Sequence, residues 1–459
     1  MERTTPPNLE ALLARIAELE ERVQSLEAEN RDLRNRLDEA QRRAARQAAP
    51  FRRREAKKVP EGRKKRPGRP KGHPAGFRPL PARYDDHVEA PLAASPGCGG
   101  AVEGVEPVEQ FIEEIPPIRP RVTRSVTYRG RCAGCGEVHS SHPLQTSTAT
   151  GAAQTQLGPD ARAWAVALNK QFGLTTRETC RVLKGLVGLS LSPGGLAQAA
   201  QRTARKVLPC YDSLVQEVRA AAAVYVDETS WYFGGPGHWL WTFTTADATV
   251  YHVDRSRGRQ VVLDLLGGDF QGVLVSDCLA SYESLPYRMH KCIAHHQKAI
   301  AEARDRADTL DPSHLNQWKL LFTMVIALWR HRPTLGEEEF ARQRSHLESW
   351  LDRLLSEERV QPGDRAIQQR IGKRRGAVLG CLDDPAAEPT NNRAERSLRD
   401  VGVIARKLSC GNKTEAGKVA WERLTSLAVT CQQRGHDFDS WLAACLPLNA
   451  PVVAVPPAR

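Results

Sequence analysis

Long apolar runs are missing from this chain of 459 residues, and no stretch approaches the roughly 20 residues that a membrane-spanning helix needs. The first residues, MERTTPP, also lack the apolar core of a signal peptide. Hydrophobic residues still make up 41% of the chain, which is typical of globular proteins. We therefore expect a cytoplasmic protein without a membrane partner, whose eleven cysteines are buried thiols or metal ligands rather than disulfides.

Positive charge is concentrated near the N-terminus. The formal net charge is +12, and residues 1–83 alone hold 22 Lys and Arg against 12 Asp and Glu. Such an asymmetry indicates a polyanionic partner. We expect double-stranded DNA, and association with the nucleoid when DNA is bound.

A heptad pattern runs through residues 9–37. Its positions are Leu9, Leu12, Ile16, Leu19, Val23, Leu26, Asn30, Leu33 and Leu37. This pattern predicts a parallel coiled coil and hence a homodimer or higher oligomer, in which Asn30 at a single a position selects register and dimer. The alternative is a lone amphipathic helix packed on its own protein.

The next segment is dense in Lys, Arg, Pro and Gly and has no hydrophobic periodicity, which predicts an extended tether. Within it, KRPGRPKG resembles an AT-hook, a minor-groove binder of A·T-rich DNA, but its Arg-Pro-Gly-Arg-Pro centre departs from the usual Arg-Gly-Arg-Pro. We predict sequence-independent phosphate binding instead, with a merely solvated linker as the alternative. The candidate residues are Arg63, Lys64, Lys65, Arg66, Arg69 and Lys71.

A Cys-Gly turn at Cys98 precedes a CxxC turn formed by Cys132 and Cys135. Residues 108–115 and 122–128 between them have the composition of two strands. This layout predicts a zinc ribbon that holds one structural Zn²⁺. Ser95 stands where a paired cysteine is expected, so the fourth ligand would be His139, His87 or His142. The alternative is that these cysteines are buried structural residues.

The sequence after residue 157 predicts short helices with glycine-containing turns, compatible with either a helix-turn-helix or an ordinary helical bundle. Further on, AAAVYVDET predicts a buried strand that stops at Asp227, and QGVLVSDCLASY predicts another that ends at Asp277. Strands alternating with a helix indicate an α/β sheet whose site lies beyond the strand ends. Asp227 and Asp277 are therefore expected side by side.

Two neighbouring carboxylates repel one another unless a cation lies between them. Two Mg²⁺ or Mn²⁺ ions would relieve this repulsion and could catalyse phosphoryl transfer, but a third carboxylate is needed to hold them. The stretch EPTNNRAERSLRD supplies one. If a helix begins at Asn391, then Asn391, Glu395 and Arg399 share one face while Ala394 and Leu398 face a core.

In this interpretation Glu395 faces the metal ions, and nearby polar side chains contact DNA phosphates. The candidates for these DNA contacts are Asn391, Asn392, Arg396 and Arg399. The alternative is a capping box, in which Glu395 only closes a helix that starts at Asn392.

Several motifs resemble, in order, those of the large transposase of the insertion-sequence-66 family. They are the heptads, the basic tether, the cysteine turns, VDET with HWLW, VSDCLASY, CIAHHQKAI, PTNNRAERSLR and VIARKLSCGNKTEAG. The resemblance implies a DDE recombinase with a ribonuclease-H-like core and a helical insertion before the final Glu. It further implies Asp227, Asp277 and Glu395 as the catalytic metal-binding triad, and accessory proteins encoded by the same element.

Two departures from the family are visible: Ser95 replaces a zinc cysteine, and CIAHHQKAI lacks a Trp and several Arg that commonly follow Cys292. Cys292 and His295 resemble half a metal site without a second half. We expect them to be structural or close to DNA.

We thus expect a multidomain α/β protein that acts as a DNA transposase on the terminal repeats of its element and on target DNA. The alternatives are a dimeric DNA-binding regulator with an inactive core and a structure-specific nuclease. The expected units are a coiled coil (1–48), a tether (49–83), a zinc-ribbon-like domain (84–148), a helical domain (149–218), the first part of the catalytic core (219–300), a helical insertion (301–385), the last part of the core (386–445) and a flexible tail (446–459).

Overall fold

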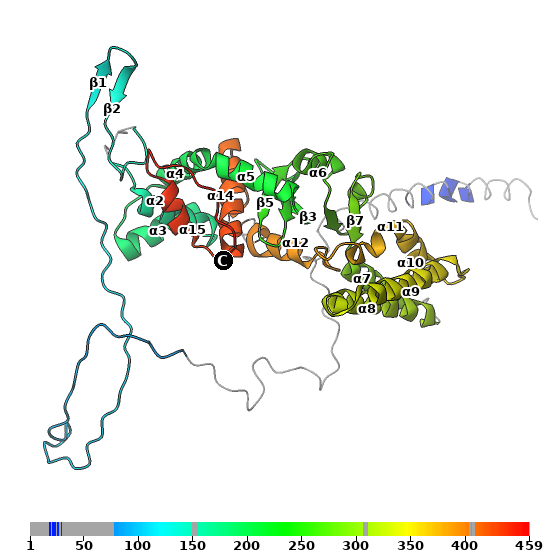
Figure 1. Cartoon of the computed structure of the whole chain (residues 1–459), viewed down its shortest axis with the longest axis horizontal. Helices are drawn as coiled ribbons and strands as arrows, with labels where there is room; N and C mark the ends of the chain where they lie inside the picture. The colour runs from blue at the N-terminus through cyan, green and yellow to red at the C-terminus, as the bar shows by residue number, and fades with distance from the viewer. Residues whose placement is uncertain are drawn as a thin grey trace, which may run out of the picture.

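The computed structural model describes most of the chain beyond residue 77 (Figure 1). The described residues are 18–19, 21–23, 25–26, 29, 78–148, 155–305, 311–403, 405 and 409–458, without the side chains of residues 400 and 403. Most of the predicted coiled coil and residues 49–77 of the predicted tether lie outside them. Of the heptad positions, Leu19, Val23 and Leu26 are described as helical, and each is about half exposed (49%, 53% and 48%).

A five-stranded sheet forms the centre of the protein, with the strand order β5-β4-β3-β6-β7. Its strands are β3 (Ala223–Trp231), β4 (His238–Thr244), β5 (Thr249–Asp254), β6 (Val273–Ser276) and β7 (Arg288–Lys291). The first three strands are antiparallel, whereas β6 and β7 run parallel to β3. Together with the many helices, this sheet confirms the mixed α/β fold class.

Strand β3 is longer than expected, because it does not stop at Asp227 but continues to Trp231. The additional residues pair with β4, from Glu228 opposite Trp241 onwards. Pairing with β6 ends earlier, at Tyr225 opposite Val275. Asp227 therefore lies inside a strand, at the point where its parallel neighbour has ended.

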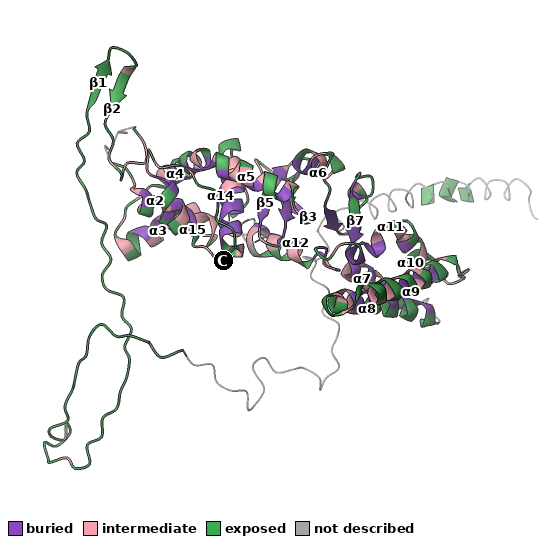
Figure 2. Ribbon diagram, in the orientation of Figure 1, coloured by how far each residue is buried: buried purple, intermediate pink, exposed green. Residues whose placement is uncertain are grey.

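Different helices cover the two faces of the sheet, and the sheet itself is largely buried (Figure 2). One face, which includes Val224 and Val226, belongs to the main core with α5 (Leu208–Arg219), α6 (Arg259–Leu266) and α14 (Glu415–Gln433). The opposite face carries the segment that contains α12 (Asn392–Ser397). Its apolar residues Ala223, Tyr225, Val273 and Val275 pack with Ala387 and Ala394.

Helix α14 also covers the outer edge of the sheet. Three of its side chains, spaced four residues apart, accept the outward backbone N–H groups of β5. The pairs are Glu422 with Val253 (2.6 Å), Ser426 with Tyr251 (2.9 Å) and Thr430 with Thr249 (3.1 Å). The unpaired donors of this edge strand are thus satisfied by a helix.

A group of helices lies at one end of the described structure (Figure 1). Three of them come before the sheet in the sequence and one comes after it. They are α2 (Pro159–Lys170), α3 (Thr176–Val187), α4 (Pro193–Lys206) and α15 (Phe438–Cys445). Helix α3 begins with a capping box between Thr175 and Glu178. Because α2 contacts α15 and α4 contacts α14, these helices form one bundle, and a helix-turn-helix role stays a prediction.

A second group of helices lies at the other end (Figure 1) and has its own apolar core. It consists of α7 (Ile293–Arg304), α8 (Ser313–His331), α9 (Glu337–Ser356), α10 (Pro362–Gly372) and α11 (Arg375–Val378). The short 3₁₀ helices are η2 (Ala280–Tyr282), η3 (Arg332–Thr334) and η4 (Gly380–Leu382). The helices from α7 to η4 separate β7 from α12 in sequence, whereas η2 lies between β6 and β7. None of the helices in the described ranges combines the length and apolarity that a membrane crossing requires.

Within residues 78–148, β1 (Arg129–Cys132) and β2 (Gly136–His139) form a hairpin. The strands predicted at residues 108–115 and 122–128 are absent, and these residues have no regular secondary structure. Their apolar side chains stay in solvent, with Ile112 87% and Val122 92% exposed. No neighbouring strand among the described residues offers them the pairing that β-structure requires.

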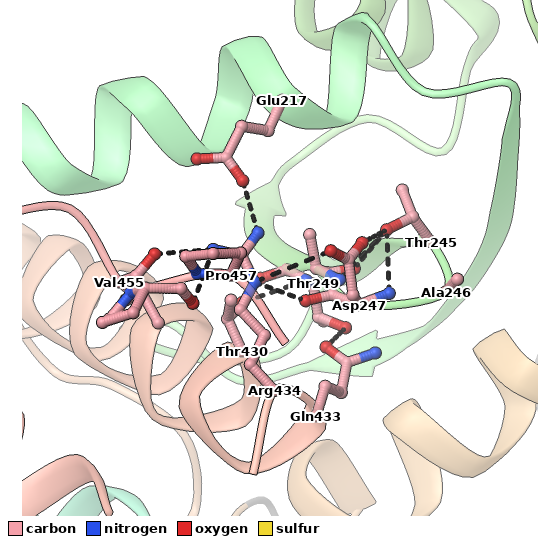
Figure 3. A network of polar contacts seen from close by, with 12 residues as sticks. Glu217, Thr245, Ala246, Asp247, Thr249, Thr430, Gln433, Arg434, Val455 and Pro457 are labelled. Atoms are coloured by element: carbon pink, nitrogen blue, oxygen red, sulfur yellow. Dashed lines mark hydrogen bonds and ion pairs between the residues drawn. The ribbon is translucent and has the colours of Figure 1, made fainter. Parts of the chain in front are cut away.

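The C-terminal segment, expected to be a flexible tail, instead packs against the body of the protein. Val455 is buried, and its carbonyl accepts a hydrogen bond from the buried Arg434 guanidinium at 2.8 Å. The same guanidinium contacts the Glu217 carboxylate and donates to the carbonyl of Asp247 at 3.0 Å (Figure 3). Arg434 therefore ties the tail, α5 and the β4–β5 turn together.

Candidate active site

Strand register brings Asp227 and Asp277 together. β3 and β6 pair in parallel up to Tyr225 opposite Val275, an offset of 50 residues. Asp227 and Asp277 are also 50 residues apart, and each lies two residues after its member of this last pair. Asp227 shares the face of Tyr225 because side chains alternate along a strand, and that face packs against α12. The two carboxylates thus follow the apolar residues that α12 covers.

The carboxyl group of Asp227 is held in an environment that disfavours its charge. Burial raises its pKa well above the usual range, and the charges of Glu228, Asp277 and Glu395 raise it further. One oxygen, Oδ1, accepts the backbone N–H of Glu228 at 3.0 Å. The other, Oδ2, is buried and has no hydrogen-bond partner among the described residues. An unpartnered buried oxygen of this kind is able to serve as a ligand for a cation.

Glu395 reaches this cluster from α12. The helix begins after Asn391, and no side chain caps its first turn, so Glu395 is not part of a capping box. Its side chain is 15% exposed, and its charge contributes to the raised pKa of Asp227. Ala394 and Leu398 are buried, as the helical spacing predicted.

Asn391 has a different role from the predicted DNA contact. It is completely buried, and its Nδ2 donates to the carbonyl of Val226 at 2.8 Å. A buried side chain cannot reach a phosphate, so this prediction is wrong. Asn391 instead fastens the start of α12 to the residue before Asp227.

The other polar residues predicted near Glu395 are accessible. Asn392, Arg396 and Arg399 are all exposed. Helix α12 ends at Ser397 and is followed by a π-helical segment, η5 (Leu398–Val403). Arg399 therefore does not continue the α-helical spacing of Asn391 and Glu395.

Glu228 lies on the opposite face of β3 from Asp227, where it pairs with Arg257. The guanidinium donates to Oε1 through Nε at 2.9 Å and Nη2 at 2.7 Å, and the Tyr282 hydroxyl donates to Oε2. Burial raises the pKa of Glu228 to about 7. Because these contacts are buried, we expect loss of the Glu228 carboxylate or of its arginine partner to destabilise the fold.

A buried lysine beside Asp277 was not anticipated. Lys291 at the end of β7 donates to Ser276 Oγ at 3.0 Å, and burial lowers its pKa to about 8 while the Asp277 charge raises it. It lies over the Tyr282 ring, with Nζ 5.2 Å from the ring centroid. Nothing in the sequence RMHK marks this lysine, because its burial follows from a strand pairing that the sequence does not reveal.

The predicted zinc ligands form two separate turns. Cys132 and Cys135 lie together in the β1–β2 hairpin, where N–H groups and the second thiol lower the pKa of Cys132. The Cys98 thiol instead interacts with Ser95. Within the described ranges Cys98, Cys132, Cys135 and His139 do not form a group of three neighbouring ligand atoms, and all four are exposed. As arranged here, they do not make a tetrahedral site.

A cleft of about 660 Å³ lies away from the acidic residues. It is bounded by the turn between α2 and α3, the start of α4 and residues 409–421, and its lining includes Lys170, Arg177 and Lys413. Asp227, Asp277 and Glu395 do not line it. The basic residues predicted at positions 63–71 lie outside the described residues.

The donor types of Asp227, Asp277 and Glu395 suit a hard divalent cation, but among the described residues these carboxylates do not bring one oxygen each within 4.8 Å of the other two. Carboxylate oxygens are the ligands that Mg²⁺ and Mn²⁺ prefer, and the unpartnered Oδ2 of Asp227 offers one directly. A cation would also remove the repulsion that raises the pKa of Asp227.

Comparison with known proteins agrees with the resemblance seen in the sequence. The chain is 25% identical over 411 residues to the uncharacterized protein y4jD of Sinorhizobium fredii (strain NBRC 101917 / NGR234), which covers 81% of this chain and 78% of that relative. The family model described as "Transposase IS66 family" matches residues 154–420, more than half of the chain, and this stretch includes Asp227, Asp277 and Glu395. The chain therefore belongs to the IS66 family of transposases.

Proposed function

We propose that this protein is a DDE-type transposase, which cleaves DNA at the ends of its element and joins the freed 3′ hydroxyl to target DNA. Asp227, Asp277 and Glu395 would hold two Mg²⁺ or Mn²⁺ ions. The observation that carries the proposal is that Asp277 and Glu395 are near enough for their charges to raise the pKa of Asp227, whose Oδ2 is buried and has no partner among the described residues.

The chain's own residues fix the carboxylates before DNA arrives. The backbone N–H of Glu228 orients Asp227, and the backbone N–H of Leu279 donates to Asp277 Oδ1 at 2.8 Å. Asn391 holds the start of α12 against β3, which keeps Glu395 in place. When bound, the metal ions supply activation of the attacking oxygen and stabilisation of the leaving oxygen. The protein's contribution is positional, since in-line displacement depends on geometry.

The sheet supports a ribonuclease-H-like core. Three antiparallel strands followed by two parallel ones, with order β5-β4-β3-β6-β7, are compatible with that fold. The helices from α7 to α11 come between β7 and α12, where the expected insertion would lie. They also separate Asp277 from Glu395 in the chain.

We assign DNA contacts to two regions. Near the carboxylates, the exposed Asn392, Arg396 and Arg399 offer donors for phosphates. Farther away, the basic tether with Arg66, Arg69 and Lys71 would add sequence-independent affinity. Neutralising these three tether residues should flatten the dependence of log K on log salt by roughly two to three units.

A structural zinc ion would require the Cys98 turn to approach the Cys132–Cys135 hairpin. Zinc analysis of the purified protein tests this directly: we expect about one structural Zn²⁺ per chain, lost in Cys132→Ser but retained in Cys180→Ser, a buried thiol in α3. Equal zinc content in wild type and Cys132→Ser would remove this site from the proposal.

The catalytic assignment is tested with Asp227→Asn, Asp277→Asn and Glu395→Gln. With Mg²⁺ and DNA carrying the terminal inverted repeats that flank the gene, each variant should lose cleavage and joining by about a hundredfold or more. DNA affinity should stay nearly unchanged, because the tether is intact. The matched control is Asp264→Asn on the exposed side of α6.

The same assay separates the alternatives. Cleavage without strand joining would indicate a nuclease, and DNA binding without either reaction would indicate a regulator. Retained strand transfer in Glu395→Gln would overturn the assignment of the triad.

A further inference from the structure

Cys292 and His295 lie directly beside Glu395. One ligand atom from each of these three residues is within 4.8 Å of the other two, and within the described ranges this is the one such group of three or more potential metal ligands. The nearest imidazole and carboxylate atoms, His295 Nε2 and Glu395 Oε1, are 3.9 Å apart. Glu395 thus completes a potential metal site whose other ligands are Cys292 and His295.

Backbone contacts hold the two halves together. Cys292 precedes the first residue of α7 and His295 lies in its first turn, so both side chains lie at the same helix end. The N–H of Ile293 donates to the carbonyl of Pro389 at 3.0 Å, and the N–H of Asn391 donates to Cys292 Sγ at 3.2 Å. The start of α12 is therefore fastened to the start of α7 on both sides of the cluster.

The distance between His295 and Glu395 favours an ion between them over a direct bond. At 3.9 Å the two atoms are too far apart for a hydrogen bond. The other ring nitrogen, Nδ1, is buried and has no hydrogen-bond partner among the described residues. Neither nitrogen of His295 is therefore committed to another residue by a hydrogen bond.

The donor types select the kind of metal. A thiolate, an imidazole and a carboxylate form a ligand set that suits Zn²⁺, whereas Mg²⁺ prefers oxygen ligands alone. Three protein ligands leave a fourth position open for water. Burial raises the pKa of the Cys292 thiol to about 11, but the N–H groups of Asn391, His295 and Ala294 favour the thiolate. Metal binding would displace the thiol proton to solvent.

We propose that Cys292, His295 and Glu395 form a separate site for a thiophilic divalent ion such as Zn²⁺, which shares Glu395 with the acidic cluster. An ion in this site draws the Glu395 carboxylate away from Asp227 and Asp277. Zinc would then inhibit the Mg²⁺-dependent reaction. This inhibitory consequence rests on the proposed function, whereas the binding itself does not.

Binding is tested spectroscopically with Co²⁺ as the probe. The full chain carries Cys98→Ser, Cys132→Ser and Cys135→Ser, which silence the N-terminal thiols. Titration should give a thiolate-to-cobalt charge-transfer band that saturates near one ion per chain and disappears on adding Zn²⁺. Adding Cys292→Ser should abolish the band, and adding His295→Ala should weaken Zn²⁺ affinity at least about tenfold.

A matched control is Cys381→Ser, which removes another fully buried thiol that lies in a separate apolar core. It should leave the cobalt spectrum unchanged, and circular dichroism should show that all variants are folded. If Cys292→Ser does not fold, the half-buried His295→Ala still decides the outcome through zinc affinity. Absence of the band in the folded parent protein would overturn the proposal.

Inhibition is measured separately, with each variant compared to its own zinc-free rate. The zinc concentration for half-inhibition should rise about tenfold or more in Cys292→Ser. If His295→Ala slows the Mg²⁺ reaction but neither substitution changes cobalt or zinc binding, His295 only positions Glu395 and the metal site is rejected. If the parent protein shows no Mg²⁺-dependent reaction yet gives the cobalt band, the proposed function fails and the site stands.

Discussion

Arg257 and Glu228 form a buried ion pair on the face of β3 opposite Asp227. Two hydrogen bonds of 2.9 and 2.7 Å join the guanidinium to one carboxylate oxygen, and the guanidinium carbon lies 4.3 Å from the centroid of the Trp239 ring. Glu228 is almost completely buried, whereas the side chain of Arg257 is 28% exposed. The reverse side of the acidic cluster is thus held by its own charge pair.

Arg257→Ala should therefore lower stability by about 2 to 4 kcal/mol, because it leaves the Glu228 carboxylate buried without a cation. Glu228→Gln should cost less, since its amide oxygen can still accept from the arginine while its NH₂ group donates to the Tyr282 hydroxyl. Thermal melting followed by circular dichroism measures both. Equal melting temperatures for wild type and Arg257→Ala would contradict this account.

The burial of the Glu422 carboxyl predicts a pH dependence of stability. Burial raises the pKa of Glu422 to about 7, so the folded protein binds a proton that the unfolded chain releases near its ordinary pKa. The stabilisation is fully present below about pH 4.5 and is lost as the pH rises through about 7. Charged groups that face this carboxyl are His252, Glu415, Lys418 and Arg423.

Glu422→Gln should remove this part of the pH dependence while keeping an oxygen that accepts the Val253 N–H. Between pH 5 and pH 8, the free energy of unfolding of wild type should fall by on the order of 2 kcal/mol more than that of the variant. Melting temperatures across this range provide the measurement, with the exposed Glu358→Gln as the control. An unchanged slope in Glu422→Gln would show that Glu422 does not titrate in this way.

Substitution of the buried Arg434 should destabilise the C-terminal region. Arg434→Ala removes bonds to Val455, Asp247 and Glu217 and should cost about 3 kcal/mol. Limited proteolysis should then cut within residues 446–458 faster than in wild type. Arg342, on the exposed side of α9, pairs with Glu339, so the control Arg342→Ala should change stability by less than about 0.5 kcal/mol.

The half-exposed Leu19, Val23 and Leu26 predict self-association through the N-terminal helix. Deleting residues 1–45, or combining Leu19→Lys with Leu26→Lys, should convert the protein to a monomer in light scattering. Replacing Asn30 with Ile should raise the stability of the assembly and relax its oligomeric state. An unchanged mass after the deletion would rule out the coiled coil as the dimer contact.

Sequence patterns predicted the elements whose signals are local. Buried runs of Val and Leu identified β6, and helical spacing identified Ala394 and Leu398 as buried residues. The continuation of β3 beyond Asp227 was missed because it depends on pairing with β4, and β7 was missed because Arg288–Lys291 carries three basic side chains.

The sequence was sufficient to predict the acidic residues Asp227, Asp277 and Glu395, but not the residues that surround them. Asp277 was expected at a strand end, since an aspartate follows a short apolar run. The burial of Asn391 and the approach of Cys292 to Glu395 arise from contacts between residues 165 and 99 positions apart, and no local periodicity encodes such contacts.

The row of Glu422, Ser426 and Thr430 along β5 also limits how copies of this protein can associate. An open strand edge invites β-augmentation, domain swapping and fibrillar aggregation, because its free N–H groups can pair with any extended chain. Here each outward donor of β5 already has a side-chain acceptor, and at the far edge Gly380 approaches β7 so closely that a Cβ would lie 2.3 Å from the Met289 carbonyl oxygen. Any association between copies of this protein would therefore use helices and loops rather than strand pairing at these edges of the sheet.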